Sequence, residues 1–204
     1  MISVTNAKAE TKLFTLAELE QFFNFRYISR LEFDHYEVEQ WLRKKCQQAH
    51  KKHSIDLLPC WLGQLHSKQL EQCFLEDVAL RWVCPEIGYG IFTNKPIKKW
   101  DFIGEYVGLV RRRNILMRNV NDYCFMYPRA WLSWKPFTID SQAQGNLTRF
   151  INHSDQPNLE SLSVYWDGVF HVIFRAIEDI AVGTELRYDY GSLYWQKRKK
   201  HLSS

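Results

Sequence analysis

Residues 149–158 read Arg-Phe-Ile-Asn-His-Ser-Asp-Gln-Pro-Asn, an unusual sequence for a core strand. Two apolar side chains, Phe150 and Ile151, lead directly into the polar run Asn152-His153-Ser154. A core strand does not normally continue in this way, because buried polar groups need hydrogen-bond partners. The stretch therefore predicts either a brace between loops or the wall of a site.

The adjacent His153 and Ser154 raise the alternative of a serine hydrolase. Neighbouring residues of an extended segment point to opposite faces, so these two cannot readily act as base and nucleophile. The sequence also has no G-x-S-x-G nucleophile elbow. Both observations argue against a hydrolase.

Three more segments combine glycines with polar or aromatic residues: 88–90, 104–108 and 183–191. A G-x-G pair lets a backbone approach a ligand closely, although it is more often a simple turn. In the last segment, Tyr188 and Tyr190 are two residues apart and therefore share one face of an extended chain. They are either core tyrosines or the wall of an aromatic pocket with polar tips.

Short strands are predicted from about residue 83 onward. Runs of β-branched and aromatic residues occur at 90–93, 102–110, 162–165 and 169–174, separated by Asn, Gly, Pro and Asp. The Asp167-Gly168 pair predicts a tight hairpin, because type I′ turns need residues that tolerate positive φ.

The first part of the chain is predicted to be helical. Thr15 and Glu18 form a capping box, and Leu16, Leu19, Phe22 and Phe23 follow at helical spacing. Tyr36, Trp41 and Leu42 continue the pattern less regularly, and a second helical region is expected at 54–82. We divide the chain into a helical N-terminal region at 1–81, a β-rich domain at 82–191 and a basic, helical tail at 192–204.

Composition and cysteine usage indicate a folded protein of a reducing compartment. Of the 204 residues, 46% are hydrophobic and 25% are charged, which is typical of soluble domains. No run approaches the roughly 18 apolar residues of a membrane span, and the N-terminus lacks the apolar core of a secretory signal. Five cysteines without a C-x-x-C pair predict neither a disulfide framework nor a zinc ribbon.

A zinc site remains the alternative for Cys46, His50, His53 and Cys60, whose spacing is roughly suitable. They lie in a Gln/Lys-rich, solvated stretch, so we expect no metal. The net charge of +4 arises mainly from the basic runs at 111–113 and 197–200. A dedicated nucleic-acid binder would carry a broader basic surface, so no direct, sequence-specific nucleic-acid binding is expected.

Taken together and in this order, the segments resemble the SET domain of protein lysine methyltransferases over about residues 82–191. The matching motifs are G-x-G at 88–90, E-Y-x-G at 105–108, R-F-x-N-H-S…P-N at 149–158 and G-E-E-L-x-Y-D-Y-G at 183–191, with Asp140 before Gly145-Asn146 also fitting. The resemblance implies a mainly β fold with some helices, the SET β-clip of short strands. It also implies that the C-terminal segment threads beneath a loop as a pseudoknot, an exception to the usual avoidance of threading.

The resemblance further implies an S-adenosylmethionine-dependent enzyme that methylates a lysine in a histone or histone-like basic tail. Tyr190 matches the active-site tyrosine, and Tyr123 resembles a second tyrosine of the lysine channel. Tyr188 stands where the family has Phe or Tyr; its hydroxyl would retain a water, which implies mono- or dimethylation. The implied cofactor-binding residues are Gly88, Tyr89, Gly90, Arg149, Phe150, Asn152, His153, Tyr190 and Trp195.

One departure from the family is informative. Many members carry a cysteine after N-H-S and a C-x-C…C tail that share a zinc ion, whereas this chain has Asp155 and a tail, Ser192–Ser204, without cysteine. Tyr194 or Trp195 would close the site instead. This pattern resembles the compact bacterial SET proteins, including the chlamydial type thought to act on host chromatin. It implies an effector exported by a non-Sec route into a host cell and its nucleus.

Two questions stay open at this point. The alternative function is a catalytically silent SET fold that binds a protein partner. The helical N-terminal region is a substrate-recognition surface, a homodimer interface or a structural brace, and its mixed charge does not decide between them.

Overall fold

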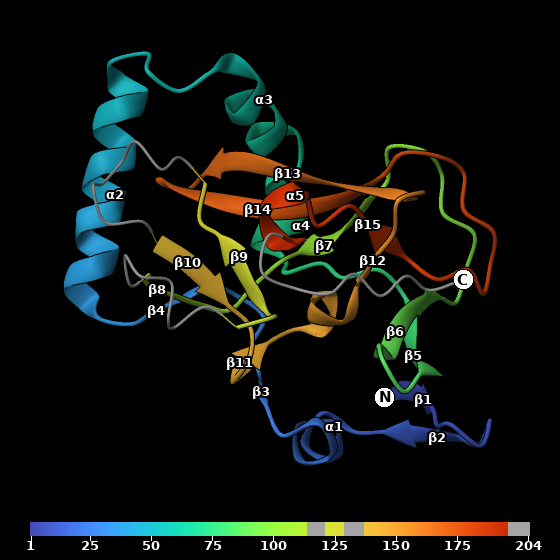
Figure 1. The fold of residues 1–204 in the computed structure, drawn as a ribbon. Coiled ribbons are helices and arrows are strands. Elements are labelled where there is room, and N and C mark those ends of the chain that lie inside the picture. The colour runs from blue at the N-terminus through green and yellow to red at the C-terminus, as the bar shows by residue number, and fades with distance from the viewer. Residues whose placement is uncertain (114–120, 129–136, 196–204) are drawn as a thin grey trace.

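The computed structural model describes residues 1–113, 121–128 and 137–195 (Figure 1). The predicted basic run at 197–200 and most of the predicted tail helix lie outside these residues. The N-terminal elements are β1 (Ile2–Thr5), β2 (Thr11–Phe14), α1 (Leu16–Phe23), β3 (Arg26–Tyr27), β4 (Glu32–Phe33), α2 (Tyr36–Lys51), α3 (Leu57–Leu65), α4 (Ser67–Glu71) and β5 (Val78–Cys84). They are followed by β6 (Gly88–Thr93), β7 (Phe102–Glu105), β8 (Leu109–Arg112), β9 (Cys124–Met126), β10 (Phe137–Asp140), β11 (Gln144–Gly145), a 3-10 helix (Leu147–Phe150), β12 (Asn152–His153), β13 (Leu159–Trp166), β14 (Val169–Ala176), β15 (Arg187–Tyr188) and α5 (Ser192–Trp195).

The mainly β fold with some helices is confirmed. The largest sheet has the order β12-β15-β13-β14-β7. Its long antiparallel hairpin, β13–β14, turns at Asp167 and Gly168, whose φ angles of 44° and 79° confirm the predicted tight turn. Late in the chain, β15 inserts between β12 and β13 and runs parallel to both. The threading implied by the resemblance concerns this same segment.

The N-terminal region is more than the helices predicted from the sequence. Helices α1 to α4 are present, but residues 2–5 and 11–14 form a hairpin, and β1 also pairs in parallel with β5. The helix predicted through residue 82 is wrong over its last part, since β5 begins at Val78. Strands this short depend on their neighbours for stability, and β1 and β5 supply each other with backbone partners across a long stretch of sequence.

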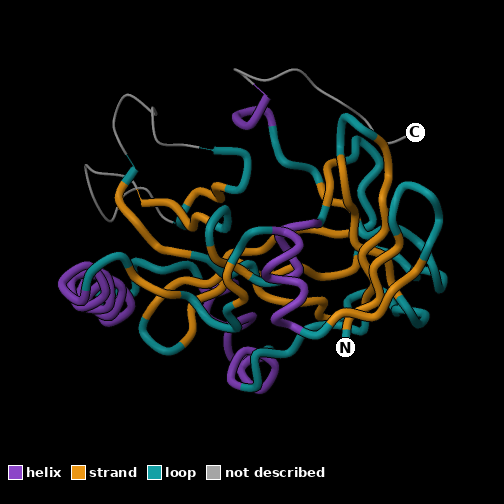
Figure 2. The backbone as a smooth tube through the Cα atoms, turned by 90° about the horizontal axis from the view of Figure 1, so that it is seen from below, coloured by secondary structure: helices purple, strands orange, loops and turns teal. Residues whose placement is uncertain are grey.

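The N-terminal region pairs directly with strands of the β-rich domain. Two short N-terminal strands, β3 and β4, pair in parallel with β11 and β8. The predicted boundary between residues 81 and 82 falls inside β5. Residues from both sides of that boundary, such as Leu19 and Phe170, also share one hydrophobic core. In a view from below, the strands run through the middle of the molecule (Figure 2).

The predicted capping box of α1 is confirmed. The Thr15 hydroxyl accepts from the Glu18 backbone N–H at 3.3 Å, and the Glu18 carboxylate accepts from the Thr15 N–H at 2.8 Å. Of the apolar residues expected on one face, Leu19 is fully buried, whereas Leu16 and Phe22 are about half exposed, at 49% and 52%.

The cysteine and histidine residues considered for zinc are distributed differently. Cys46 is buried in the core, where burial raises the pKa of its thiol to about 11, and the His50 ring stacks on Tyr165 with centroids 4.8 Å apart. In the described part of the chain, no three His, Cys, Asp or Glu residues are grouped as a metal site would need. None of the described helices has the length and hydropathy required to cross a membrane.

Candidate active site

A cavity of about 510 Å³ lies where distant segments of the chain meet. It brings together Gly88, Asn152 and Tyr190, three of the residues that the resemblance implied for cofactor binding. The complete lining consists of Phe23, Glu86, Ile87, Gly88, Tyr89, Asp122, Tyr123, Arg149, Phe150, Asn152, His153, Tyr190, Tyr194 and Trp195. Of the predicted site residues, Gly90 and Tyr188 are not part of this lining.

The two glycines of the G-x-G segment serve different purposes. Gly88 has a φ of +82°, in the left-handed region that L side chains rarely adopt, and it lines the cavity. Gly90 faces protein: a Cβ there would overlap the Glu185 carboxylate and lie 2.8 Å from Asn152 Nδ2. The lack of a side chain at Gly90 therefore leaves room for the Asn152 and Glu185 side chains to pack against β6.

Asn152 is held by a carboxylate that the sequence did not single out. Its side-chain Nδ2 donates to Glu185 Oε1 at 2.8 Å and to the Tyr89 carbonyl at 3.4 Å. Burial raises the pKa of Glu185, and the hydrogen bond from Asn152 opposes that shift. These contacts fix two segments of the cavity wall, at 89 and 152, relative to each other, with Glu185 packed behind them.

His153 contacts the segment from Tyr190 to Trp195 and holds it beside the cavity. It is buried, and its Nδ1 accepts from the Tyr190 backbone N–H at 3.2 Å. Its ring lies 4.7 Å from the Trp195 ring and 5.4 Å from the Tyr190 ring, measured between centroids. The segment after β15 is thus positioned by a side chain from β12.

The hydroxyl of Tyr190 has a fixed direction. It donates to the Ile151 carbonyl at 2.7 Å, so its hydrogen points away from any second acceptor while the oxygen keeps its lone pairs. Burial raises the Tyr190 pKa well above its usual value, so the group remains a neutral phenol at neutral pH.

Tyr188 lies behind Tyr190. It is only 8% exposed, and its ring centroid is 4.7 Å from that of Tyr190 and 4.8 Å from that of Phe174. On another side it stacks on Phe125 at 6.3 Å. Burial raises its pKa well above the usual value, so it too stays protonated.

Tyr123 and Arg149 form one wall as a stacked pair. The Arg149 guanidinium carbon lies 4.2 Å from the Tyr123 ring centroid and 4.6 Å from that of Phe25. Its Nη2 donates to the Gln142 carbonyl at 3.1 Å, and burial lowers its pKa. The Tyr123 carbonyl accepts from the Tyr106 hydroxyl at 2.6 Å, which fixes this loop from below.

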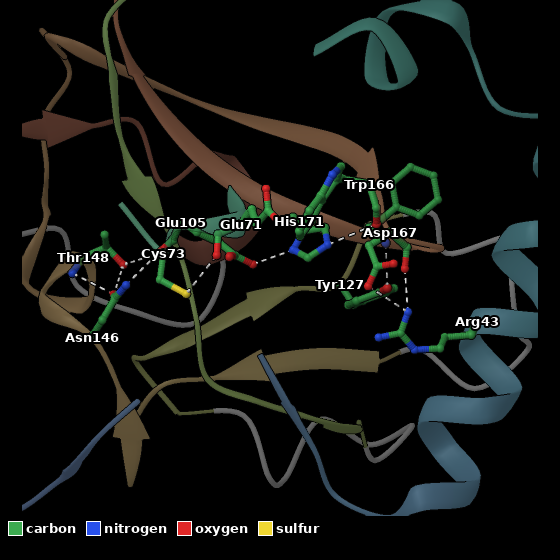
Figure 3. A network of polar contacts seen from close by, with 11 residues as sticks. Arg43, Glu71, Cys73, Glu105, Tyr127, Asn146, Thr148, Trp166, Asp167 and His171 are labelled. Atoms are coloured by element: carbon green, nitrogen blue, oxygen red, sulfur yellow. Dashed lines mark hydrogen bonds and ion pairs between the residues drawn. The ribbon is translucent and has the colours of Figure 1, made fainter. Parts of the chain in front are cut away.

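A buried polar network supports the segment that carries Arg149 and Asn152 (Figure 3). The Glu105 carbonyl accepts from Asn146 Nδ2 at 2.9 Å and from the Thr148 hydroxyl at 3.2 Å. The Glu105 carboxylate lies 2.7 Å from His171 Nδ1, whose Nε2 is 3.2 Å from the Trp166 carbonyl. The glutamate of the E-Y-x-G motif is therefore a brace below the cavity rather than a part of its wall.

The sequence did not indicate four of the lining residues: Phe23, Glu86, Ile87 and Asp122. Tyr194, one of the two residues expected to close the site, is also in the lining. Glu86, Ile87 and Asp122 lie within two residues of predicted positions, so proximity along the chain was the available signal. Phe23 comes from α1, and its ring centroid lies 4.8 Å from that of Phe150. No sequence pattern linked that helix to the cavity.

Comparisons with known proteins agree with this geometry. A family model described as the SET domain matches residues 88–191. N-lysine methyltransferase KMT5A of Xenopus tropicalis is 33% identical over 125 residues, covering 57% of this chain and 36% of the relative. Histone-lysine N-methyltransferase ash1 of Drosophila melanogaster is 32% identical over 118 residues, covering 54% of this chain and 5% of the relative. The chain thus spans a minor part of these relatives.

Among solved structures, polycomb repressive complex 2 of Chaetomium thermophilum has a TM-score of 0.52 at 27% identity, covering 65% of this chain and 17% of that chain. The same complex in an autoinhibited conformation bound to S-adenosylmethionine has a TM-score of 0.53 at 25% identity, covering 63% and 17%. Because the family match extends over half of its length and coincides with the residues around the cavity, the chain belongs to the SET-domain family.

Proposed function

We propose that this protein is an S-adenosylmethionine-dependent protein lysine N-methyltransferase. The observation that carries the proposal is the convergence of Gly88, Asn152 and Tyr190 on one cavity in a chain of the SET-domain family. Members of this family use S-adenosylmethionine, and relatives of this chain are lysine methyltransferases by name.

The lining of the cavity suits the cofactor. Its volume of about 510 Å³ falls within the range of about 300–1,000 Å³ that small-molecule sites occupy. Glu86 and Asp122 are in the lining, and their negative charge favours the binding of a sulfonium cation. The buried Nε of Arg149 has no hydrogen-bond partner among the described residues, so this guanidinium is suited to the cofactor's carboxylate.

We assign the holding of the cofactor to the lining residues already predicted. Gly88 and Tyr89 supply the backbone beside it, Asn152 and His153 the opposite wall, and Trp195 an aromatic cover. When bound, the cofactor supplies a methyl group on a positive sulfur. Gly90 takes part only indirectly, through the packing of Asn152.

The chain's own residues would then position and desolvate the lysine amine. A free lysine has a pKa near 10.4, so under about 1% is neutral at pH 7, and burial among aromatic rings favours loss of the proton. Tyr190 keeps its phenol proton, so it acts through its lone pairs and not as a base. Holding both reactants in line is worth roughly 7 to 11 kcal/mol of the barrier.

The finer parts of the proposal concern the substrate and the product. The histone-lysine methyltransferases among the relatives support a histone or histone-like basic tail as the substrate. Tyr188, adjoining Tyr190 with its hydroxyl intact, supports mono- or dimethylation. We also propose a compact bacterial effector that acts on host chromatin, because Asp155 stands after N-H-S, where many family members carry a zinc-binding cysteine.

The test is methyl transfer from radiolabelled S-adenosylmethionine to histones and other basic proteins, with the modified lysine identified by mass spectrometry. Tyr190→Phe should abolish transfer while the fold persists, because it removes the oxygen that faces the reacting groups. The matched control is Tyr36→Phe, since Tyr36 is 70% exposed and lies outside the cavity.

One outcome would revise the proposal and another would overturn it. Full activity of Tyr190→Phe would remove that tyrosine from its assigned role. Cofactor binding by the wild-type protein, with no transfer to any basic protein, would instead support the catalytically silent SET fold.

A further inference from the structure

A second cavity, of about 640 Å³, lies between the β1–β2 hairpin and α1. We call it the hairpin groove, and its principal lining residues are Val4, Lys12, Phe14, Glu18, Phe22 and Tyr89. Tyr89 also lines the proposed cofactor cavity, so one side chain forms part of both walls. Apart from Tyr89, its lining residues belong to the N-terminal region, outside the residues that the SET family model matches.

Aromatic rings form much of this groove. Phe14 and Phe22 meet edge to face with centroids 5.3 Å apart, and Phe22 meets Tyr89 in the same manner at 6.1 Å. Phe22 is 52% exposed. Ring faces of this kind attract alkylammonium cations, most strongly when several rings and a carboxylate surround the same space.

The groove also carries the complementary charge, and it already holds an ammonium group of its own. Glu10 and Glu18 are both in the lining. The Lys12 Nζ lies 5.0 Å from the Phe14 ring centroid and 3.6 Å from Glu18 Oε1. The Lys12 and Glu18 side chains are 67% and 45% exposed, so their ion pair is weak and readily exchanged for another cation.

We propose that the hairpin groove is a second alkylammonium site, which binds a lysine side chain, free or methylated, of the basic protein tail. Lys12 is an internal occupant that this ligand displaces. The inference rests on the proposed function for the identity of the ligand. In the enzyme, the groove would bind a basic residue of the substrate other than the lysine that is modified, or the methylated lysine of the product.

In the experiment, small-molecule probes are titrated into the protein without cofactor, and binding is monitored by methyl NMR of Val4, which lies in the groove. The probes are Nα-acetyl-lysine amide, its Nε-trimethyl form and the neutral analogue Nα-acetyl-norleucine amide. Both cations should shift the Val4 signals and norleucine should not. The ratio of the two cation affinities then tells whether free or methylated lysine is the better ligand.

Variants of the groove make the inference quantitative. Lys12→Ala should tighten binding of the trimethyl probe by about two- to five-fold, because it removes the competing ammonium. Phe22→Leu should weaken it by a similar factor of about two to five, because it keeps an apolar side chain but removes the ring. Lys8→Ala is the matched control: it removes the same charge from the hairpin turn, outside the groove lining, and should leave the affinity unchanged.

The result that overturns the inference is a Val4 signal unmoved by either cation, or Lys12→Ala binding no tighter than Lys8→Ala. These outcomes are distinct from failure of the proposed function. A wild-type protein that methylates lysine but shows no Val4 shift loses only the groove site, whereas one that shows the shift but transfers no methyl group loses only the enzymatic assignment.

Discussion

Replacing Gly90 with alanine should displace the Asn152 or Glu185 side chain and so disturb the cavity wall at Asn152. The added Cβ would overlap the Glu185 carboxylate and lie 2.8 Å from Asn152 Nδ2, so one of these side chains must move. Overpacking of this kind costs about 1 to 3 kcal/mol. For a chain of 204 residues, this corresponds to a fall in Tm of about 2 to 12 °C.

Thermal unfolding measures the stability, and calorimetry with S-adenosylhomocysteine measures the effect on the cavity. Gly88→Ala is the control, because nothing lies within 4 Å of its Cβ position and its cost comes from the φ of +82° alone. Glu185→Ala should relieve the overlap in Gly90→Ala but not the strain in Gly88→Ala. The first double mutant should therefore be less destabilised than the sum of its parts, by about 0.5 to 3 kcal/mol.

A Gly90→Ala variant that unfolds at the wild-type temperature and binds with wild-type affinity would contradict the overlap with Glu185. Strictly additive costs of Gly90→Ala and Glu185→Ala would contradict it too, because the close approach would then not be the cause.

Three further predictions concern the site. Tyr188→Phe should shift the product toward trimethyl-lysine, since it removes the hydroxyl that would hold a water; an unchanged distribution by mass spectrometry contradicts this. Ending the chain after Gly191 removes the Tyr194 and Trp195 rings from the cavity lining and should weaken cofactor binding by about tenfold or more, whereas unchanged calorimetric affinity would make both rings bystanders. Burial raises the Glu185 pKa, so folding favours its protonated form, and that contribution is complete below the usual pKa and lost as the pH rises through the folded-state pKa. Glu185→Gln should accordingly unfold at higher urea concentration than the wild type at pH 7 but not at pH 4, and the same difference at both pH values would refute it.

Features that depend on a few neighbouring residues were predictable from the sequence. The capping box of Thr15 and Glu18 and the turn at Asp167-Gly168 are each specified within four residues, and the structure has both. Tyr188 and Tyr190 adjoin as expected of residues two apart in an extended chain.

Features that depend on distant partners were not predictable in this way. The start of β5 continues the apolar pattern of the preceding helices, and only its pairing with β1 and β6 makes it a strand. Glu185 lies in the motif at 183–191 and received no role from the sequence, yet it anchors Asn152 across 33 residues of sequence. Phe23 reaches the cavity because α1 packs beside it, a relation that no local pattern contains.

The position of β15 between β12 and β13 has a consequence for biosynthesis. Until residue 190 has been synthesised, the largest sheet of the nascent polypeptide lacks β15, the strand between β12 and β13. The Tyr190 phenol, which lines the cavity, is missing as well. Parallel pairing between segments so remote is slow, because loop closure must precede any gain from contact. Newly made molecules should therefore pass through a stage in which the unpaired edges of β12 and β13 bind chaperones. The cavity should be complete only after β15 has paired with both strands.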